Sequence, residues 1–317
     1  NDTKRIIINS SGNVGIGVSD PDMKLEVNGQ IKIDSSVSGD NIMAIINSAS
    51  DGYGPYFKAG GGNTSQFLFK LLTHNNTEKF RVDGDGRVGI GAEAHNYYSS
   101  ADNLVVYDSA EHAGITIASG GANKTGNIYF ADGTSGVAEY EGYIEYNHSN
   151  NSMIFGTNHA TRLSIDSTGA VTMPAQPAFH AGGNDGSVNG AGQVIKFDSE
   201  RFDQNSDYST STGIFTAPVT GKYYLQTQVL VANVSNGQRF DLNCVTSNVT
   251  FTFGSPGRLE VQSGTTWNDS TKYIALGGNT IIEMDAGDTA KIQFGAFGGG
   301  GVYTGSSWTY FSGYLAC

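Results

Sequence analysis

The sequence predicts an all-β protein in two parts, a series of repeated β-hairpins followed by a two-sheet β-sandwich. Glycine accounts for 44 of the 317 residues and charged residues for only 15%, a composition that favours strands and turns over helices. Apolar residues recur at every second position in short runs, which is the period of a strand with one buried face. In addition, the first 173 residues contain three copies of one hairpin-like line.

The repeated line reads IIINSSGNVGI at 6–16, FRVDGDGRVGI at 80–90 and LSIDSTGAVTM at 163–173. Each copy begins with an apolar alternation and then reaches an Asn or Asp that can open a tight turn. A glycine follows three residues later and can adopt the positive φ that such a turn requires. A second apolar alternation completes the line, so each copy predicts a β-hairpin.

An isolated two-stranded hairpin is only marginally stable in water, so the apolar face of each repeat must be buried against another part of the chain or another copy. We expect the aliphatic residues of the second strands to pack between three copies of the chain. These trimer-packing residues are Val14, Ile16, Val88, Ile90 and Val171. Glycine weakens a strand unless another backbone approaches closely, and the expected approach is that of other chains around a threefold axis. The glycines concerned are Gly15, Gly17, Gly89 and Gly91.

Residues 1–173 are therefore predicted to form a slender β-rich shaft of hairpins and small β segments. The further strand-like runs in it are FLFKLL (67–72), GNIYFADG (126–133) and YIEYNHSNNSMIFG (143–156). Residues 174–193 concentrate Pro, Gly, Asn and Asp, which indicates a linker or an irregular entry into a new domain.

From residue 194 to residue 317 the short strand-like runs follow one another at sandwich spacing, which predicts a jelly-roll β-sandwich head. They include YYLQTQVLV (223–231), VTFTF (249–253), AKIQF (290–294) and WTYFSGYL (308–315). Trp308 opens the last run and is expected in the core. Cys244 lies within an apolar alternation, as a buried thiol would, although a disulfide between Cys244 and Cys317 remains an alternative.

The net charge of −12 argues against a nucleic-acid partner, because such affinity rests largely on Lys and Arg neutralising phosphates. No window approaches the ~20 consecutive apolar residues that a membrane span requires, so membrane insertion is not expected. The first residues, NDTKRIIINSS, lack an initiator Met and a signal-peptide core. We therefore expect the chain to be a fragment of a longer protein.

The C-terminal region resembles the globular head of the q subunit of the first complement component, a jelly roll of the tumour-necrosis-factor type. The resemblance is carried by FDQNSDYSTSTGIFTAPVTGKYYLQ (202–226), MDAGDTAKIQF (284–294) and FSGYL (311–315). The Gly-rich stretch at 294–308 departs from the animal members.

The N-terminal part is similar to the repeated segments of bacteriophage tail fibres. The similar stretches are SSGNVGIGVSDPDMKLEVNGQIKI (10–33), YFADGTSGVAEYEGYIEYNHSNNSMIFGTN (129–158) and TRLSIDSTGAV (161–171). Both resemblances imply a homotrimer. Together they imply a tail fibre of the virion, joined to other virion proteins at its N-terminal end, with a head that attaches to a glycan or protein of the host cell surface.

Three other functions remain open at this point: a secreted cell-adhesion or complement-like trimeric binding protein, a structural decoration fibre of a virion, and a depolymerising spike. A depolymerising spike would need paired carboxylates, for which Glu139, Glu141, Glu145 and His148 are candidates. Their alternation with tyrosines is better explained by a half-exposed strand, so we expect no catalytic residues and a non-enzymatic protein. No cofactor is expected either, although the Asp-rich stretches 83–86 and 182–187 could take Ca²⁺ in place of forming turns.

For recognition of a receptor, large exposed aromatic side chains beside polar ones are the usual means, since rings bury area at little entropic cost. Such residues lie outside the clean alternations in SGTTWNDSTKY and GGGVYTGSSW. The predicted receptor-binding residues are Trp267, Asn268, Asp269, Tyr273 and Tyr303.

Overall fold

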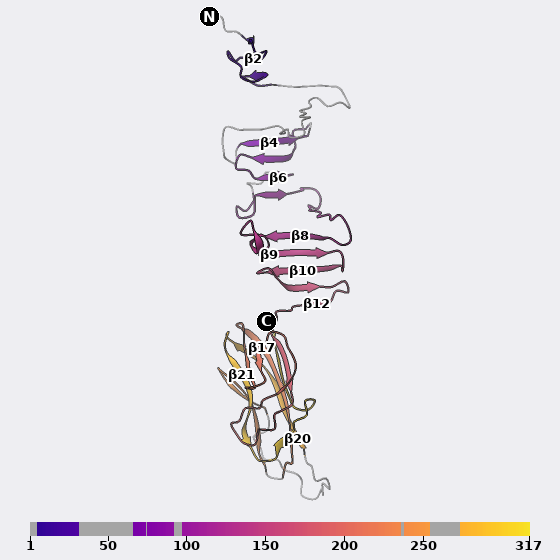
Figure 1. The fold of residues 1–317 in the computed structure, drawn as a ribbon, viewed down its shortest axis with the longest axis vertical. Coiled ribbons are helices and arrows are strands. Elements are labelled where there is room, and N and C mark those ends of the chain that lie inside the picture. The colour runs from indigo at the N-terminus through magenta and orange to yellow at the C-terminus, as the bar shows by residue number, and fades with distance from the viewer. Residues whose placement is uncertain (1–4, 32–65, 74, 92–96, 236–237, 254–272) are drawn as a thin grey trace. The chain divides into compact units, whose positions relative to one another are not determined.

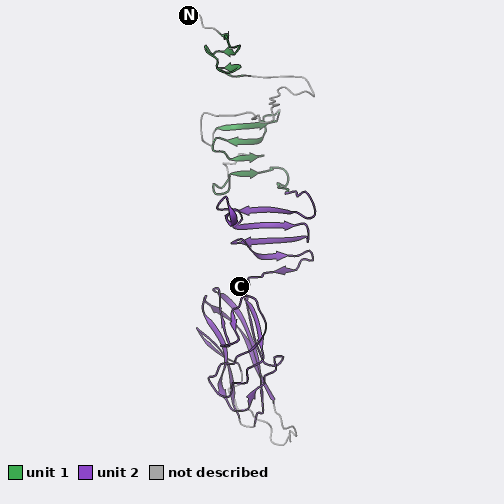
Figure 2. Ribbon diagram, in the orientation of Figure 1, with its two compact units in different colours: residues 1–116 green, residues 117–317 purple. Residues whose placement is uncertain are grey.

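The computed structural model describes residues 5–31, 66–73, 75–91, 97–235, 238–253 and 273–317 (Figure 1). Strands dominate the described residues, in which helical structure is limited to a single 3₁₀ turn, η2 (Gly136–Glu139), so the predicted all-β class is confirmed. No helix in these ranges has the length and apolarity of a membrane span. The chain separates into two compact units, residues 1–116 and 117–317 (Figure 2).

The first unit contains two small sheets with the same construction. A three-stranded sheet has the order β1-β2-β3, and a four-stranded sheet has the order β4-β5-β6-β7. The strands are β1 (Ile6–Ile8), β2 (Val14–Ile16), β3 (Leu25–Val27), β4 (Phe67–Leu72), β5 (Glu78–Asp83), β6 (Val88–Ile90) and β7 (Leu104–Val106). In both sheets a predicted hairpin is extended on one side by a further strand, β3 or β7, and the second sheet also has β4 on its other side.

The three hairpin turns share one local geometry. In the first, the Asn9 side-chain oxygen accepts hydrogen bonds from the backbone N–H groups two and four residues later, each at 3.0 Å. Asp83 and Asp166 accept the corresponding pairs in the other two turns, at distances between 2.8 and 3.2 Å. The glycine three residues after each of them has a φ between +72° and +88°. The turn residues read from the sequence therefore form the predicted hairpins.

A parallel third strand was missed in both sheets of the first unit. β3 pairs with β2 and β7 pairs with β6, each over three residues in the same register. The glycines of the second hairpin strand meet this part of the same chain. A Cβ on Gly17 would lie 3.0 Å from the Asn28 carbonyl oxygen, and one on Gly91 would overlap the Tyr107 carbonyl oxygen. The close approach expected from other chains is thus made, at these two positions, by the chain's own backbone.

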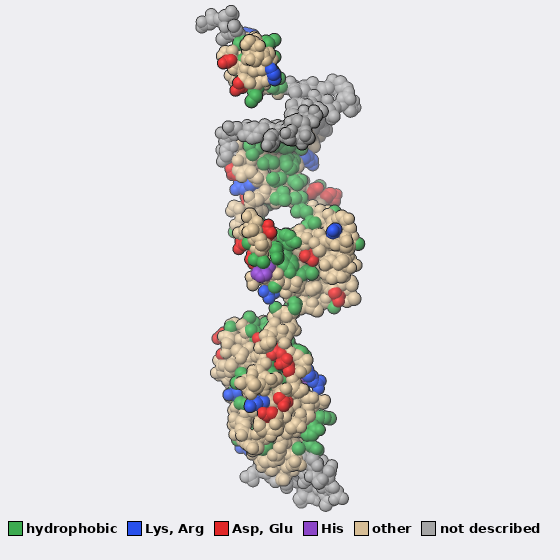
Figure 3. Space-filling view, viewed as in Figure 1, with side chains coloured by type: hydrophobic (Ala, Val, Ile, Leu, Met, Phe, Trp, Pro, Cys, Tyr) green, Lys and Arg blue, Asp and Glu red, His purple; other side chains and the backbone are tan. Residues whose placement is uncertain are grey.

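One face of each small sheet is aliphatic or aromatic and stays largely open to solvent. Direct register partners lie on the same face of a sheet. On the first sheet this face carries Ile6, Ile8, Val14, Ile16, Leu25 and Val27. On the second it carries Phe69, Leu71, Phe80, Val82, Val88, Ile90, Leu104 and Val106. Hydrophobic side chains gather over β4–β7 in Figure 3.

The second unit begins with a five-stranded antiparallel sheet in the order β12-β11-β10-β9-β8. Its strands are β8 (Thr125–Phe130), β9 (Gly142–Asn147), β10 (Ser152–Thr157), β11 (Ala160–Ile165) and β12 (Val171–Thr172). One face is again apolar and includes Ile128, Ile144, Phe155, Leu163 and Val171. The opposite face is mostly polar.

The remainder of the second unit is a two-sheet jelly roll, as predicted for the head. One sheet has the order β14-β13-β23-β17-β20 with β22 also paired to β17, and the other has the order β15-β16-β21-β18-β19. The strands are β13 (Ala178–Gly182), β14 (Ser199–Asp203), β15 (Tyr208–Ser209), β16 (Ile214–Thr216), β17 (Gly221–Ala232), β18 (Phe240–Thr246), β19 (Thr250–Phe253), β20 (Tyr273–Met284), β21 (Thr289–Phe297), β22 (Gly301–Val302) and β23 (Tyr310–Leu315).

Aromatic side chains fill the space between the two sheets. Phe179 stacks on Phe215 at 4.8 Å and on Tyr208 at 5.1 Å between ring centroids, and meets Phe311 edge-on at 5.0 Å. Phe179 lies in β13, within the range 174–193 that the sequence indicates as a linker or irregular entry. That range thus contributes a strand and a buried ring to the sandwich. The sequence does not indicate this strand, because only five residues alternate there among Pro and Gly.

The two cysteines are free. Cys244 lies in β18 with its side chain buried, and burial raises the pKa of its thiol to about 12. Cys317 is exposed. The prediction that the Cys244 thiol is buried is therefore confirmed.

The role of Gly91, which lies beside the parallel strand β7, can be tested by comparing two alanine substitutions. Both place alanine at a positive φ, so the backbone strain is similar in the two variants. Gly91 has a φ of +83° and its Cβ would overlap Tyr107, whereas Gly86 has a φ of +85° with nothing within 4 Å. We expect Gly91→Ala to break the hydrogen bond from the Tyr107 N–H to the Ile90 carbonyl, 2.9 Å long. Amide hydrogen exchange at Tyr107 should then be roughly tenfold faster than in Gly86→Ala, the effect of losing about one backbone hydrogen bond. Equal exchange in the two variants would contradict the interpretation.

Candidate binding site

The outer faces of the two head sheets differ in chemistry. Along β17 the side chains of Tyr223, Leu225 and Val229 enter the core, so the residues between them point outward. The outward side chains of this sheet form what we call the aromatic face. They include His180, Phe202, Tyr224, Gln226, Gln228, Leu230, Tyr273, Asn279, Ile281, Tyr310 and Tyr314.

The outer face of the other sheet is mainly polar. Its register partners include Asn243 with Gln293, and Asn243 with Thr252. Thr250 and Thr252 on the edge strand β19 are exposed. In the described part of the head, the exposed rings lie on the aromatic face, and a monomer rarely exposes a contiguous apolar patch of that kind.

Ring contacts run across the aromatic face from strand to strand. Tyr224 lies 5.2 Å from Tyr314, and His180 is stacked between Tyr310 at 5.4 Å and Phe202 at 6.2 Å, measured between ring centroids. Burial between these rings, followed by the charge of the nearby Arg201 guanidinium, lowers the pKa of His180. The imidazole therefore favours its neutral form and acts as a third ring in the stack.

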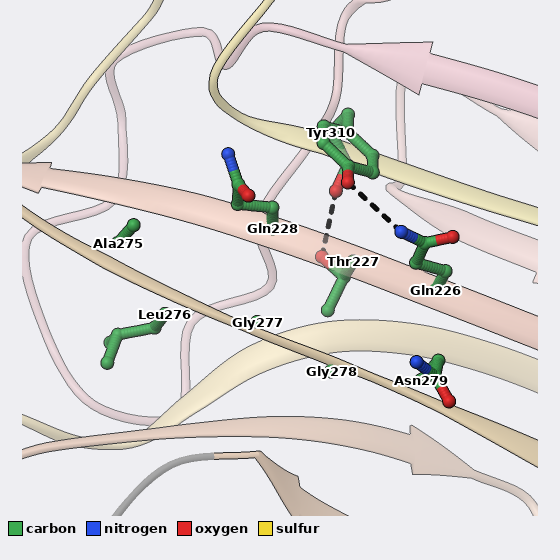
Figure 4. Close-up of a pocket in the computed structure, with 9 residues that line it drawn as sticks. All are labelled: Gln226, Thr227, Gln228, Ala275, Leu276, Gly277, Gly278, Asn279 and Tyr310. Carbon is green, nitrogen blue, oxygen red and sulfur yellow. Dashed lines mark hydrogen bonds between the residues drawn. The ribbon is translucent and has the colours of Figure 1, made fainter.

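A polar hollow of about 290 Å³ lies on this face, between β17, β20 and β23. Figure 4 shows the amide groups of Gln226 and Gln228 flanking the Tyr310 ring, above the bare backbone of Gly277. Gln226 donates a hydrogen bond to the Tyr310 hydroxyl at 3.1 Å. A Cβ on Gly277 would lie 2.6 Å from the Thr227 carbonyl oxygen, so this position excludes a side chain. The hollow thus offers amide and hydroxyl groups over an accessible backbone.

An apolar hollow of about 340 Å³ lies further along the same sheet and is lined by Leu230, Tyr273, Tyr303 and Trp308. The rings of Tyr273 and Tyr303 meet edge to face at 6.0 Å. β22 pairs with the end of β17 and so carries Tyr303 to this place. Trp308 is 57% exposed, and the Gln228 amide donates to its carbonyl oxygen at 3.1 Å. The hollow combines ring faces and edges in an arrangement suited to binding a flat or cyclic group.

The apolar hollow lies at one end of the sandwich. β17 begins beside the C-terminus, where the Lys222 N–H donates to the Cys317 carbonyl at 2.8 Å, and ends where Ala232 pairs with Tyr273. The chain enters the head at the first end, because Ala178 pairs with Tyr314 there. The apolar hollow therefore lies at the end of the head opposite to the chain's entry.

Among the predicted receptor-binding residues, the structure brings Tyr273 and Tyr303 together. Trp267, Asn268 and Asp269 lie outside the described residues. Trp308, expected in the core, belongs instead to the surface of the apolar hollow, since its backbone N–H bonds to the Gly305 carbonyl in a turn that precedes β23. Leu230 was not singled out from the sequence, where it is one more apolar residue of a strand.

The carboxylates considered for catalysis do not converge on one place. Glu139 ends η2 and is exposed, while Glu141 pairs with His159 at 3.6 Å. Glu145 lies on the polar face of its sheet, whereas His148 packs against Tyr146, whose side chain belongs to the apolar face. The described residues that line the two hollows of the head include no carboxylate, imidazole or thiol.

The Asp-rich stretches form turns. Asp83 accepts two backbone hydrogen bonds in its hairpin, and Asp185 accepts the Ser187 N–H at 2.9 Å. Within the described parts of the chain, no group of three or more His, Cys, Asp or Glu side chains is placed to hold a metal ion.

Comparison with known proteins identifies the head. Residues 178–316 match the C1q domain family. Among solved structures, the globular domain of a zebrafish complement 1qA protein is similar at 23% identity, over 45% of this chain and 98% of that one, with a TM-score of 0.33. The Eiger TNF of S. frugiperda is 14% identical over 45% and 93% of the two chains, with a TM-score of 0.33. Murine APRIL is 12% identical over 44% and 98%, with a TM-score of 0.32.

The family match spans the strands from β13 to β23 that build the two-sheet sandwich. Residues 178–316 of this chain are therefore a C1q domain with a TNF-like jelly-roll fold.

Proposed function

We propose that the chain is a homotrimeric tail-fibre protein of a bacteriophage, and that its C1q head attaches the virion to a host cell-surface glycan or protein without catalysing a reaction. The observation that carries the proposal is the one-sided chemistry of the head. One outer face is aromatic, the other is polar, and an apolar hollow lies at the end away from the chain's entry. These features support binding through the head.

The trimer is supported by apolar surface that a single chain leaves uncovered. On the head, Ile281 is 63% exposed in the middle of a regular strand, and Tyr314 is 49% exposed. On the hairpin sheets, the predicted trimer-packing residues Ile16, Ile90 and Val171 are also exposed on apolar faces. Contact between copies would remove this surface from water at about 25 cal/mol per Å².

The repeated hairpins support the assignment of the chain to a virion. Three turns of the same geometry, each followed by an aliphatic strand, recur in a region whose sequence is similar, over most of residues 5–173, to fibre-type segments. In this proposal the N-terminal end joins other virion proteins and the head lies at the free end. Each single contact of the apolar hollow with a receptor is small, and three heads per fibre multiply it through avidity.

The proposed association of the heads predicts the effect of a charge on each outer face. Ile281→Glu places a carboxylate on the aromatic face, where burial against another copy would cost several kcal/mol. We expect this variant to be monomeric by light scattering coupled to size exclusion, while the unaltered chain has three times the monomer mass. Thr252→Glu, on the polar outer face of the other sheet, is the matched control and should remain trimeric. A monomeric parent chain, or equal behaviour of the two variants, would contradict the proposal.

The proposed attachment predicts that the apolar hollow controls adsorption. Fluorescently labelled full chain, added to a panel of bacterial strains, should bind a subset of them and block infection by the phage that adsorbs to those strains. Trp308→Ala and Tyr303→Ala should each weaken binding by roughly tenfold or more, since buried aromatic anchors typically contribute about 2 kcal/mol. Val249→Ala, exposed at the entry end of the head near Thr246, is the control and should bind normally.

Each alternative function gives a different result in this assay. Binding to animal cells but to no bacterium would favour a secreted adhesion or complement-like protein. Binding to no cell at all would favour a structural decoration fibre. Release of reducing sugars from a bound polysaccharide would contradict the non-enzymatic proposal.

A further inference from the structure

A separate hollow of about 250 Å³ lies on the polar face of the sheet β8–β12, outside the C1q domain. Its lining consists of Tyr129, Tyr140, Tyr143, Glu145 and His159. Three tyrosine rings and a carboxylate thus share one small concavity. No part of the proposed attachment site uses these residues.

Regular secondary structure holds the rings in place. Tyr129 on β8 and Tyr143 on β9 are direct register partners and so share a face. The Tyr143 ring occupies the space above Gly156, where a Cβ would overlap it, and its hydroxyl lies 3.1 Å from the Thr161 hydroxyl. Tyr140, just after η2, stands 6.3 Å from Tyr129 with the ring planes tilted by 49°. The sheet therefore sets the positions of two of the three rings, those of Tyr129 and Tyr143, and Tyr140 adds a third ring from the turn after η2.

The charge of the hollow is negative. Glu145 is half-buried on β9 and makes no ion pair with any residue in the described ranges. Glu141 stands beside the rim, where its carboxylate lies 3.6 Å from the His159 Nδ1. No Lys or Arg is among the described lining residues. A cation placed in the hollow would be attracted to this carboxylate.

Assembly would leave this hollow open. The opposite face of the same sheet carries Ile144, Phe155 and Leu163 and is the face that other copies would cover. Register places Tyr143 and Glu145 on the polar face, because neighbours along a strand alternate between faces. A ligand could therefore reach the hollow in the monomer and in the trimer.

We propose that this hollow binds a small organic ammonium group, such as the trimethylammonium end of choline. The negative faces of aromatic rings attract such cations, and a quaternary ammonium, which donates no N–H hydrogen bonds, is recognised through rings and charge alone. Glu145 supplies the net charge, and Tyr129, Tyr140 and Tyr143 supply the ring surface. The site is distinct from the head and independent of the attachment proposed for it.

The experiment compares choline with its neutral isostere, in which a carbon replaces the quaternary nitrogen. Both are titrated into the purified full chain, and binding is followed by tyrosine fluorescence and calorimetry. The two ligands have the same shape, so any difference reports the charge. We expect choline to bind about tenfold more tightly than the isostere, the size of a partly desolvated cation–π site beside a carboxylate.

Two variants and one control locate the binding. Glu145→Gln keeps the shape of the side chain and should abolish the preference for choline over the isostere. Tyr129→Leu, at a half-exposed ring, should weaken choline binding by several-fold. Glu139→Gln removes an exposed carboxylate of η2 outside the hollow and should bind like the unaltered chain. Circular dichroism confirms that each variant is folded.

Three results would overturn the proposal. Equal affinity for choline and the isostere would indicate an apolar site without charge recognition. Tighter binding of a neutral hexose than of choline would indicate a sugar site. Absence of choline binding by the folded chain would refute the assignment directly, whatever the adsorption assay of the head shows.

Discussion

The period of the β-strand is the constraint on which the structure depends. Successive side chains point to opposite faces, so an alternating apolar pattern always creates one face that needs cover. In the sheets β1–β3 and β4–β7 that face is built from side chains such as Ile8 and Leu104, which remain more than half exposed. The turns, the glycines and the third strand organise the face but do not cover it. Association with further copies of the chain is the simplest way to remove it from water.

In the head, a second sheet covers the apolar face that the strand period creates. Its two inner faces cover each other, and rings such as Phe179 and Phe311 are almost completely buried between them. The outer faces of the two sheets remain in contact with solvent, and one is aromatic whereas the other is polar. Because the inner faces already stabilise the fold, the rings outside are available for contacts between molecules. The C1q domain can therefore be stable as a sandwich and still require a partner on one side.

Local signals in the sequence predicted more than non-local ones. The hairpins could be predicted because Asn9, Asp83 and Asp166 hold their own turns within four residues. The parallel strands β3 and β7 could not be predicted, because no tight turn connects them directly to the strands with which they pair. The residues near each strand do not indicate its register when the connection is longer. For the same reason the glycines at 17 and 91 were assigned to contacts between chains. Trp308 was misplaced because the predicted run begins at Trp308, whereas β23 begins two residues later, at Tyr310, and Trp308 lies in the preceding turn.

The candidate sites show why a surface is harder to read than a core. Tyr273 and Tyr303 could be selected as exposed rings, but their meeting depends on the pairing of β17 with both β20 and β22. That pairing puts the apolar hollow at the end of the sandwich away from the chain's entry. If copies associate through the middle of the aromatic face, their hollows lie at the same end and can engage one surface together. Weak contacts then suffice, because the second and third occur at a high effective concentration.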